Sequence, residues 1–161
     1  MNKIQKWLFL AGFIIMAQGC QKDDICPEGT ETTPLLVIEF YDAQDPSRLK
    51  AVQNLLVKAS GEEIYSGPAT ANTIRIPLKT NDNVTEYSFT ANSGSSSANE
   101  DVISFTYDPS PQYLNRACGY KVNFKNLDAN TLQDDNNWIV SEIVLQENVE
   151  NETEAHISIT H

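Results

Sequence analysis

Short apolar runs recur along the chain from Leu35 onward, and clusters of Gly, Asn, Asp, Ser and Pro separate them. Several runs alternate between apolar and polar residues, which is the pattern of a strand with one buried face. In residues 73–78, for example, Ile74, Ile76 and Leu78 share one face. No long run has the spacing of an amphipathic helix, so the pattern predicts an all-β domain.

The same alternation predicts the inward faces of three later strands, residues 84–91, 102–107 and 120–125. The side chains expected to face inward are Tyr87, Phe89, Ala91, Ile103, Phe105, Tyr107, Tyr120, Val122 and Phe124. The intervening polar residues, among them Lys121 and Asn123, are expected to face solvent.

The connections are predicted from their turn-forming residues. Residues 92–99 are rich in Ser, Gly and Asn and indicate a hairpin loop, and Pro-Ser-Pro at residues 109–111 indicates a turn. Residues 49–59 are ambiguous, because a helical turn near residues 48–54 also fits. A further strand is expected over residues 138–146.

Eight or nine short strands without intervening helices are typical of a β-sandwich. We therefore predict a single sandwich of the immunoglobulin-like, Greek-key type over residues 35–161. A closed β-barrel is the alternative. The strand order does not follow from one sequence.

The first part of the chain has the pattern of an export signal. Lys3 and Lys6 precede an apolar run over residues 7–17, which is too short to cross a bilayer, since a transmembrane helix needs about 20 apolar residues. Ala17 and Gly19 are the small residues that a signal peptidase requires.

Cys20 directly follows these small residues, as in a bacterial lipobox, although Ala17 stands where Leu is commoner. We predict a signal peptide over residues 1–19, lipidation of Cys20, and a flexible linker over residues 20–34. Two acyl chains are what stable anchoring takes. The alternative is an ordinary cleaved signal with Cys20 as a chance thiol.

The four residues after this cysteine, Gln21, Lys22, Asp23 and Asp24, resemble a short surface-export signal. They predict a protein anchored to the outer membrane and facing the cell exterior. A periplasm-facing position, with the acidic residues acting only as a solvated spacer, is the alternative.

The chain is strongly acidic, with 11 basic and 22 acidic residues and a net charge of −11. Loss of residues 1–19 removes Lys3 and Lys6 but no acidic residue, so nine basic residues and a net charge of −13 remain. Such a surface repels phosphate groups, which argues against nucleic-acid binding and against electrostatic adsorption to membranes.

With Cys20 carrying lipid, Cys26 and Cys118 remain as an even pair in an oxidising compartment, which predicts a disulfide. Closing a loop of roughly 90 residues contributes about 4–5 kcal/mol in the chain-entropy model. A reactive or metal-binding thiol pair is the alternative.

Few residues suggest chemistry. His156 and His161 are expected at the surface without a catalytic role, because one alternates with polar residues and the other is the last residue. Asp128, Asp134 and Asp135 are weak candidates for calcium, but their spacing does not match an EF-hand.

Two aromatic residues are candidates for sugar binding. Trp138 and Tyr113 could stack on a sugar if exposed, although Trp138 fits the core or the core edge better.

Four segments resemble a known family: residues 23–26, 33–42, 116–121 and 151–157. They are similar to an uncharacterised family of small outer-membrane lipoproteins of Bacteroidota, a domain of unknown function. The resemblance implies an envelope lipoprotein with Cys26 and Cys118 as a pair, and it brings no activity, substrate or catalytic residue.

We therefore expect a membrane-anchored, non-enzymatic lipoprotein that serves as a binding or structural accessory and needs no cofactor. Its expected partners are the membrane, through Cys20, and an envelope protein or a glycan. The alternatives are a glycan-binding accessory of a nutrient-uptake complex and, from another class, a hydrolase.

Overall fold

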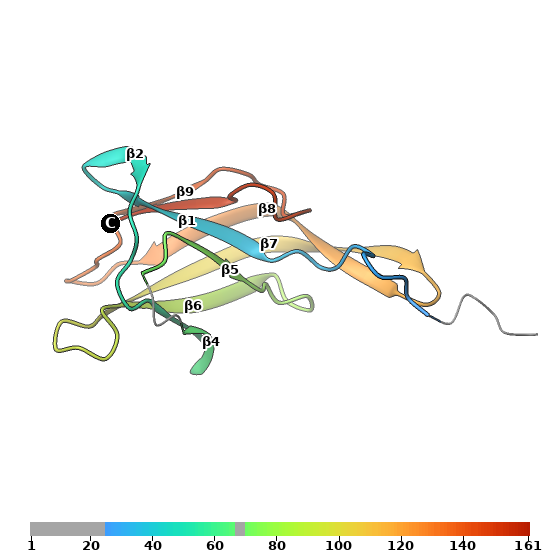
Figure 1. Cartoon of the computed structure of the whole chain (residues 1–161), viewed down its shortest axis with the longest axis horizontal. Coiled ribbons are helices and arrows are strands. Elements are labelled where there is room, and N and C mark those ends of the chain that lie inside the picture. Colours follow the sequence, from blue (N-terminus) through green and yellow to red (C-terminus); the bar gives the residue numbers. More distant parts are fainter. Residues whose placement is uncertain (1–24, 67–69) are drawn as a thin grey trace, which may run out of the picture. The chain divides into compact units, whose positions relative to one another are not determined.

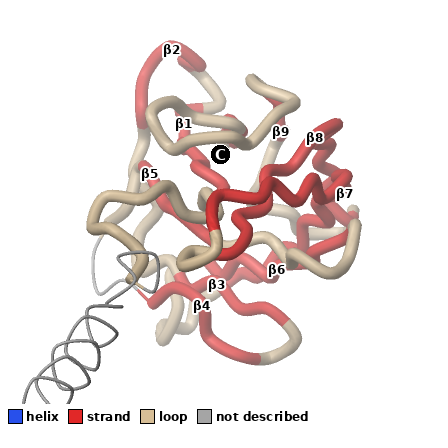
Figure 2. Tube along the Cα trace, turned by 90° about the vertical axis from the view of Figure 1, so that its right-hand side faces the viewer, coloured by secondary structure: helices blue, strands red, loops and turns tan. Residues whose placement is uncertain are grey.

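The computed structural model describes residues 25–66 and 70–161. The predicted signal peptide, Cys20 and residues 21–24 lie outside this described part. Within it the chain forms ten strands and no helix (Figure 2). The described residues accordingly contain no helix that is long and apolar enough to cross a membrane. The strands are β1 (Leu36–Asp42), β2 (Asp45–Leu49), β3 (Leu56–Ala59), β4 (Glu62–Ser66), β5 (Thr73–Ile76), β6 (Val84–Ala91), β7 (Asn99–Asn115), β8 (Gly119–Leu132), β9 (Ser141–Val144) and β10 (Ile157–Thr160).

The chain divides into two compact units. In the described part, the smaller unit contains residues 25–30 and 114–119. The larger unit contains residues 31–113 and 120–161, and with them the greater part of both sheets.

Two five-stranded sheets build the larger unit (Figure 1). One has the order β2-β1-β10-β9, with β5 pairing with β1, and the other has the order β4-β3-β6-β7-β8. β1 and β10 run parallel, with Ile38 opposite Ile157, although most of the chain separates them in sequence. The sheets do not close on themselves, so the predicted sandwich architecture is confirmed and the barrel alternative is wrong.

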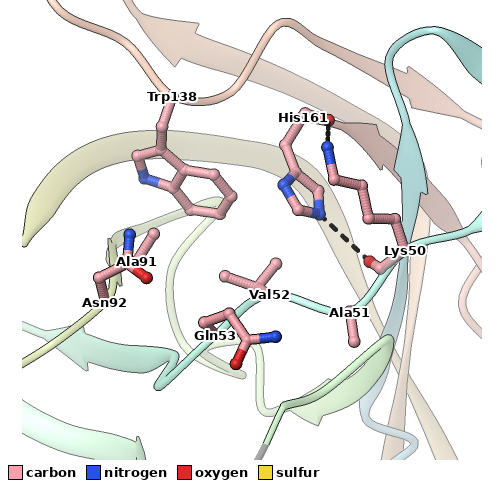
Figure 3. A pocket seen from close by; sticks show the side chains of 8 residues that line it. All are labelled: Lys50, Ala51, Val52, Gln53, Ala91, Asn92, Trp138 and His161. Atoms are coloured by element: carbon pink, nitrogen blue, oxygen red, sulfur yellow. Dashed lines mark hydrogen bonds between the residues drawn. The ribbon is translucent and has the colours of Figure 1, made fainter.

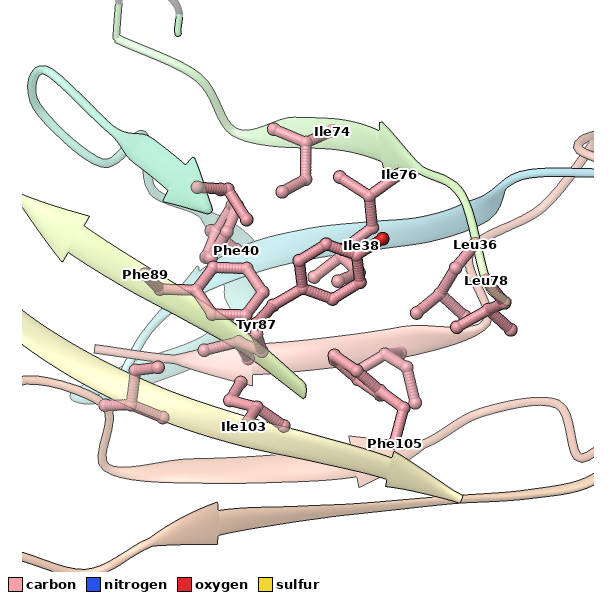
Figure 4. Close-up of a cluster of buried hydrophobic side chains, with 14 of the residues drawn as sticks. Leu36, Ile38, Phe40, Ile74, Ile76, Leu78, Tyr87, Phe89, Ile103 and Phe105 are labelled. Carbon is pink, nitrogen blue, oxygen red and sulfur yellow. The ribbon is translucent and has the colours of Figure 1, made fainter. Parts of the chain in front are cut away.

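Side chains from both sheets pack into one hydrophobic cluster (Figure 4). The alternation in residues 73–78, 84–91 and 102–107 predicted the inward faces correctly. All of its inward residues are buried: Ile74, Ile76, Leu78, Tyr87, Phe89, Ala91, Ile103, Phe105 and Tyr107. The rings of Tyr87, Phe89 and Phe105 lie edge to face, 6.3 to 6.5 Å apart. Such pairs add about 0.5–1.5 kcal/mol beyond the area they bury.

β7 leaves the sheet body halfway along its length. It pairs with β6 only between Asn99 and Thr106, and beyond that point β8 is its neighbour. We call residues 108–113 and 120–123 the ribbon. The turn predicted at residues 109–111 is wrong, because these prolines lie inside β7. A strand with a free edge tolerates proline, since the missing N–H removes no ladder bond on that side.

The predicted inward face of β8 is confirmed at Phe124, which is fully buried, but it is wrong at the start of the strand. Tyr120 is 69% exposed, whereas Lys121 is buried. Lys121 Nζ lies 2.5 Å from Glu31 Oε2, and the Val122 N–H donates to Thr33 Oγ1 at 3.0 Å. The end of the predicted linker therefore lies along the start of β8.

Two local predictions are also corrected. Residues 48–54 form no helical turn, because β2 ends at Leu49 and β3 begins at Leu56. β9 is shorter than the strand predicted over residues 138–146, so Trp138 lies in the loop before it.

Candidate functional site

A pocket of about 490 Å³ opens beside Trp138 (Figure 3). Four separate segments build it: the connection from β2 to β3, the end of β6, the loop before β9 and the residue after β10. The lining residues are Lys50, Ala51, Val52, Gln53, Ala91, Asn92, Trp138 and His161.

Backbone hydrogen bonds fix the floor of this pocket. Val52 and Ala71 exchange N–H···O bonds of 2.9 and 3.2 Å. The Asn92 N–H donates to the Gln53 carbonyl at 2.8 Å, and Asn92 has a φ of 52°. Asn adopts this left-handed conformation more readily than most residues. The two amide-bearing residues of the pocket are thereby held side by side.

The indole of Trp138 has a fixed orientation. Its Nε1–H donates to the Phe89 carbonyl at 3.0 Å. The next residue, Ile139, donates its N–H to Oδ2 of the buried Asp101 at 2.8 Å. Burial raises the pKa of the Asp101 carboxyl. These two bonds tie the loop to β6 and β7, so Trp138 is a half-buried wall of the pocket.

His161 forms the opposite wall. Its ring lies edge to face with the Trp138 indole, with the centroids 5.5 Å apart. Nε2 lies 3.1 Å from the Lys50 carbonyl, so this nitrogen carries the donated proton and Nδ1 is left as an acceptor. Lys50 Nζ donates to the His161 carbonyl at 2.7 Å. Burial lowers the pKa of the His161 imidazole, which favours its neutral form.

The pocket offers free hydrogen-bonding groups. Within the described residues, neither the Gln53 side-chain amide nor that of Asn92 has a hydrogen-bond partner. No Asp or Glu side chain is among the lining residues, whereas the Lys50 ammonium group is. An aromatic wall and two amides suit a polar ligand that also has an apolar face.

The aromatic candidates from the sequence do not meet in one site. Trp138 lines the pocket, whereas Tyr113 lies in the ribbon beside Tyr120. Sequence analysis missed Lys50, Gln53 and Asn92, because nothing in the pattern brings these segments together.

The two cysteines form the predicted disulfide, which is thereby confirmed. Cys26 and Cys118 are 92 positions apart in sequence, and both belong to the smaller unit. Neither thiol is free to bind a metal or to react as a nucleophile.

The calcium candidates lie in surface segments. Asp134 accepts the Asn136 N–H at 2.7 Å, and Asp128 accepts the Ala129 N–H at 3.0 Å. Asp135 is exposed. Across residues 25–66 and 70–161, no three His, Cys, Asp or Glu side chains are grouped to hold a metal ion.

The surface position predicted for His156 is wrong, since this side chain is 2% exposed. The Val37 N–H donates to His156 Nδ1 at 3.0 Å, and burial lowers the pKa of the imidazole. His156 directly precedes β10, whose parallel pairing with β1 brings it beside Val37. The alternation of apolar and polar residues around His156 does not reveal that Val37 is its partner.

Comparison with known proteins gives a family without an assigned role. No curated protein and no solved structure matches the chain. A model of a family of unknown function, DUF6452, matches residues 54–161, which include β3 to β10, Trp138 and His161. This agrees with the expectation of an uncharacterised domain. The chain belongs to the DUF6452 family of unknown function.

Proposed function

We propose that this protein is a cell-envelope lipoprotein that is anchored through acyl chains on Cys20 and binds a ligand without transforming it. The support for anchoring is the leader over residues 1–19 and the small residues before Cys20. The disulfide is consistent with an oxidising compartment. Residues 21–24 favour the outer membrane and the cell exterior, with a periplasm-facing position as the alternative.

The observation that carries the binding role is the Trp138 pocket. Its lining offers an oriented indole, a neutral imidazole and two amides, which can hold a ligand by stacking and by hydrogen bonds. A structural accessory without a small ligand, or a hydrolase, would not need this combination of an indole, an imidazole and two amides.

A glycan is the ligand class that the pocket favours. A pyranose has an apolar face that can lie against an indole and hydroxyls that both donate and accept hydrogen bonds. The amides of Gln53 and Asn92 likewise supply donors and acceptors, and no Asp or Glu side chain lines the pocket. On this basis the protein would serve as a glycan-binding accessory of an uptake complex.

Anchoring is tested by metabolic labelling with a fatty-acid probe. The unchanged protein should take up the label, and Cys20→Ala should abolish it. Cys26→Ser is the matched control, because it removes a cysteine six positions away and should leave the label in place. Label retained in Cys20→Ala would refute the lipoprotein assignment.

Ligand binding is tested by intrinsic fluorescence. The chain has two tryptophans, and Trp138 is the only one left once residues 1–19, which include Trp7, are removed. We expect a neutral oligosaccharide from a panel to change its emission saturably. Gln53→Ala should weaken binding about 2- to 10-fold, as expected for one neutral hydrogen bond.

Gln44→Ala is the control for this titration, because Gln44 is exposed and does not line the pocket. Equal affinities for the two variants would show that the ligand binds elsewhere. A panel without any saturable response would contradict the glycan assignment.

A further inference from the structure

Two tyrosines stand side by side on the ribbon. Tyr113 is 57% exposed and Tyr120 is 69% exposed, and their ring centroids lie 5.2 Å apart in an edge-to-face contact. After Tyr107, no ribbon residue of β7 is buried. The pair is thus the aromatic surface of a part of the protein that has little core of its own.

The ribbon holds this pair in place. The Asn123 side-chain amide donates to Gln112 Oε1 at 3.2 Å, across the two strands. Lys121, next to Tyr120, is fixed by its ion pair with Glu31. Edge-to-face packing also restrains both rings. Two large aromatic side chains are therefore kept in water by an ordered backbone.

The covalent path from the lipid to this pair is short. Cys26 lies six positions after Cys20, and its Cα lies 4.9 Å from that of Cys118. Tyr120 follows Cys118 by two positions. At no more than about 3.6 Å per residue, Tyr120 lies within about 34 Å of the lipid-bearing residue, whatever path the chain takes.

The Trp138 pocket lies far along the same strand. Its loop is bound to β7 at Asp101, twelve residues before Tyr113. A strand rises about 3.3 Å per residue, so about 40 Å of β7 separates the two places. The ribbon is accordingly the end of the larger unit that the disulfide links to the anchor.

We propose that Tyr113 and Tyr120 form a membrane-contact surface, inserting into the headgroup layer to which Cys20 is anchored. Tyrosine suits this layer because its ring is apolar and its hydroxyl is polar. The contact directs the Trp138 pocket away from the membrane, toward ligands in solution. This inference rests on the lipid anchoring in the proposed function.

The acidic surface does not oppose this contact strongly. The net charge disfavours adsorption of the free protein, but the two tyrosines are uncharged. An anchor on the same chain keeps the ribbon at a high effective concentration near the bilayer, so a weak contact is sufficient.

The experiment uses the full lipidated protein, purified from the envelope and reconstituted into phosphatidylcholine vesicles that contain brominated lipid. The lipidated protein has lost Trp7 with residues 1–19, so in a Trp138→Phe background Tyr120→Trp supplies a single reporter. We expect its emission to shift to the blue and to be largely lost to bromine quenching. Val140→Trp is the control, because Val140 is 67% exposed and lies two residues after Trp138. Its emission should be unchanged by the brominated lipid.

Equal quenching of the two reporters, or none at position 120, would overturn the inference. A second measurement avoids these substitutions. Hydrogen exchange should be slower in residues 108–113 and 120–123 of the unchanged protein on vesicles than in the Cys20→Ala protein in solution. Equal exchange in the two preparations would also overturn it.

Fatty-acid labelling of the same preparation separates the two proposals. A labelled protein whose ribbon reporter is not quenched would refute the membrane contact and leave the lipoprotein assignment standing. A protein without label would refute the anchoring, and the membrane contact with it.

Discussion

β7 passes through two different environments, and the comparison explains where the structure is stable and where it is exposed. From Asn99 to Thr106 it pairs with β6, and Ile103 and Phe105 point into the core. In the ribbon the same strand has β8 as its neighbour and carries Tyr113 in solvent. The strand continues without a break, but it contributes buried side chains only in its first part.

The difference teaches what holds each half in place. The sheet body is stabilised by burial between two sheets, with Phe89 and Phe105 fully inaccessible to solvent. The ribbon depends on individual contacts, among them the Lys121–Glu31 ion pair and the Asn123–Gln112 hydrogen bond. Substitutions should therefore cost much in the first region and little in the second.

The largest expected difference in the free energy of unfolding is between Phe105→Ala and Tyr120→Ala. Phe105→Ala should lower the free energy of unfolding by about 3–5 kcal/mol, because it leaves a cavity in the core. Tyr120→Ala should change it by less than about 0.5 kcal/mol, as is usual for an exposed side chain. Urea unfolding followed by Trp138 fluorescence measures both. Similar values for the two variants would mean that the ribbon is as well packed as the body.

Loss of the disulfide should have the second-largest effect on the free energy of unfolding. Cys26→Ser with Cys118→Ser should lower the free energy of unfolding by about 2–5 kcal/mol, since it removes a cross-link that closes a long loop. Urea midpoints, with the reduced unchanged protein as the control, measure the loss. An unchanged midpoint after complete reduction would contradict the expectation.

The ion pair of the ribbon should give a smaller effect. Lys121→Met should leave the free energy of unfolding within about 1 kcal/mol of the unchanged protein, because an apolar chain of similar length replaces a buried cation. Glu31→Gln should be the more harmful change, as it leaves the buried ammonium group without its carboxylate. The reverse order in thermal unfolding would show that Lys121 contributes mainly through its charge.

The smallest effect is a pH dependence located in the sheet body. The folded-state pKa of His156 lies below its ordinary value of 6.5, with burial as the main cause. The unfolded chain therefore binds more protons, so stability is full above about pH 6.5 and falls as the pH drops below it. Protonation also removes the acceptor of the Val37 N–H bond.

Unfolding measured between pH 8 and pH 5 tests this dependence. His156→Asn should flatten the curve, because Asn offers an acceptor but does not titrate in this range. His161→Asn is the comparison, since burial lowers the pKa of His161 as well. An unaltered curve in both variants would assign the pH dependence to the carboxylates.

The sequence predicts the faces of strands where a second sheet covers them. Ile74, Phe89 and Phe105 are buried as the alternation indicated. The rule fails at Tyr120 and Lys121, because alternation does not say which face is covered. There the covering segment, residues 31–34, is a remote and polar one that no pattern near residue 120 reveals.

The candidate site was only partly accessible to sequence reasoning. Trp138 could be named as an aromatic at the core edge, since its type and position are visible in the sequence. Gln53, Asn92 and His161 become neighbours only through the strand order. That order depends on long-range pairing such as β1 with β10, which the local pattern does not encode.

The parallel pairing of β1 with β10 also determines when the protein can become folded. Residues 36–42 are made early in synthesis, but their partners at residues 157–160 are made more than a hundred residues later. The first sheet therefore cannot be completed until residues 157–160 have been made. Until then β1 can pair with β2 and β5 but not with its parallel partner.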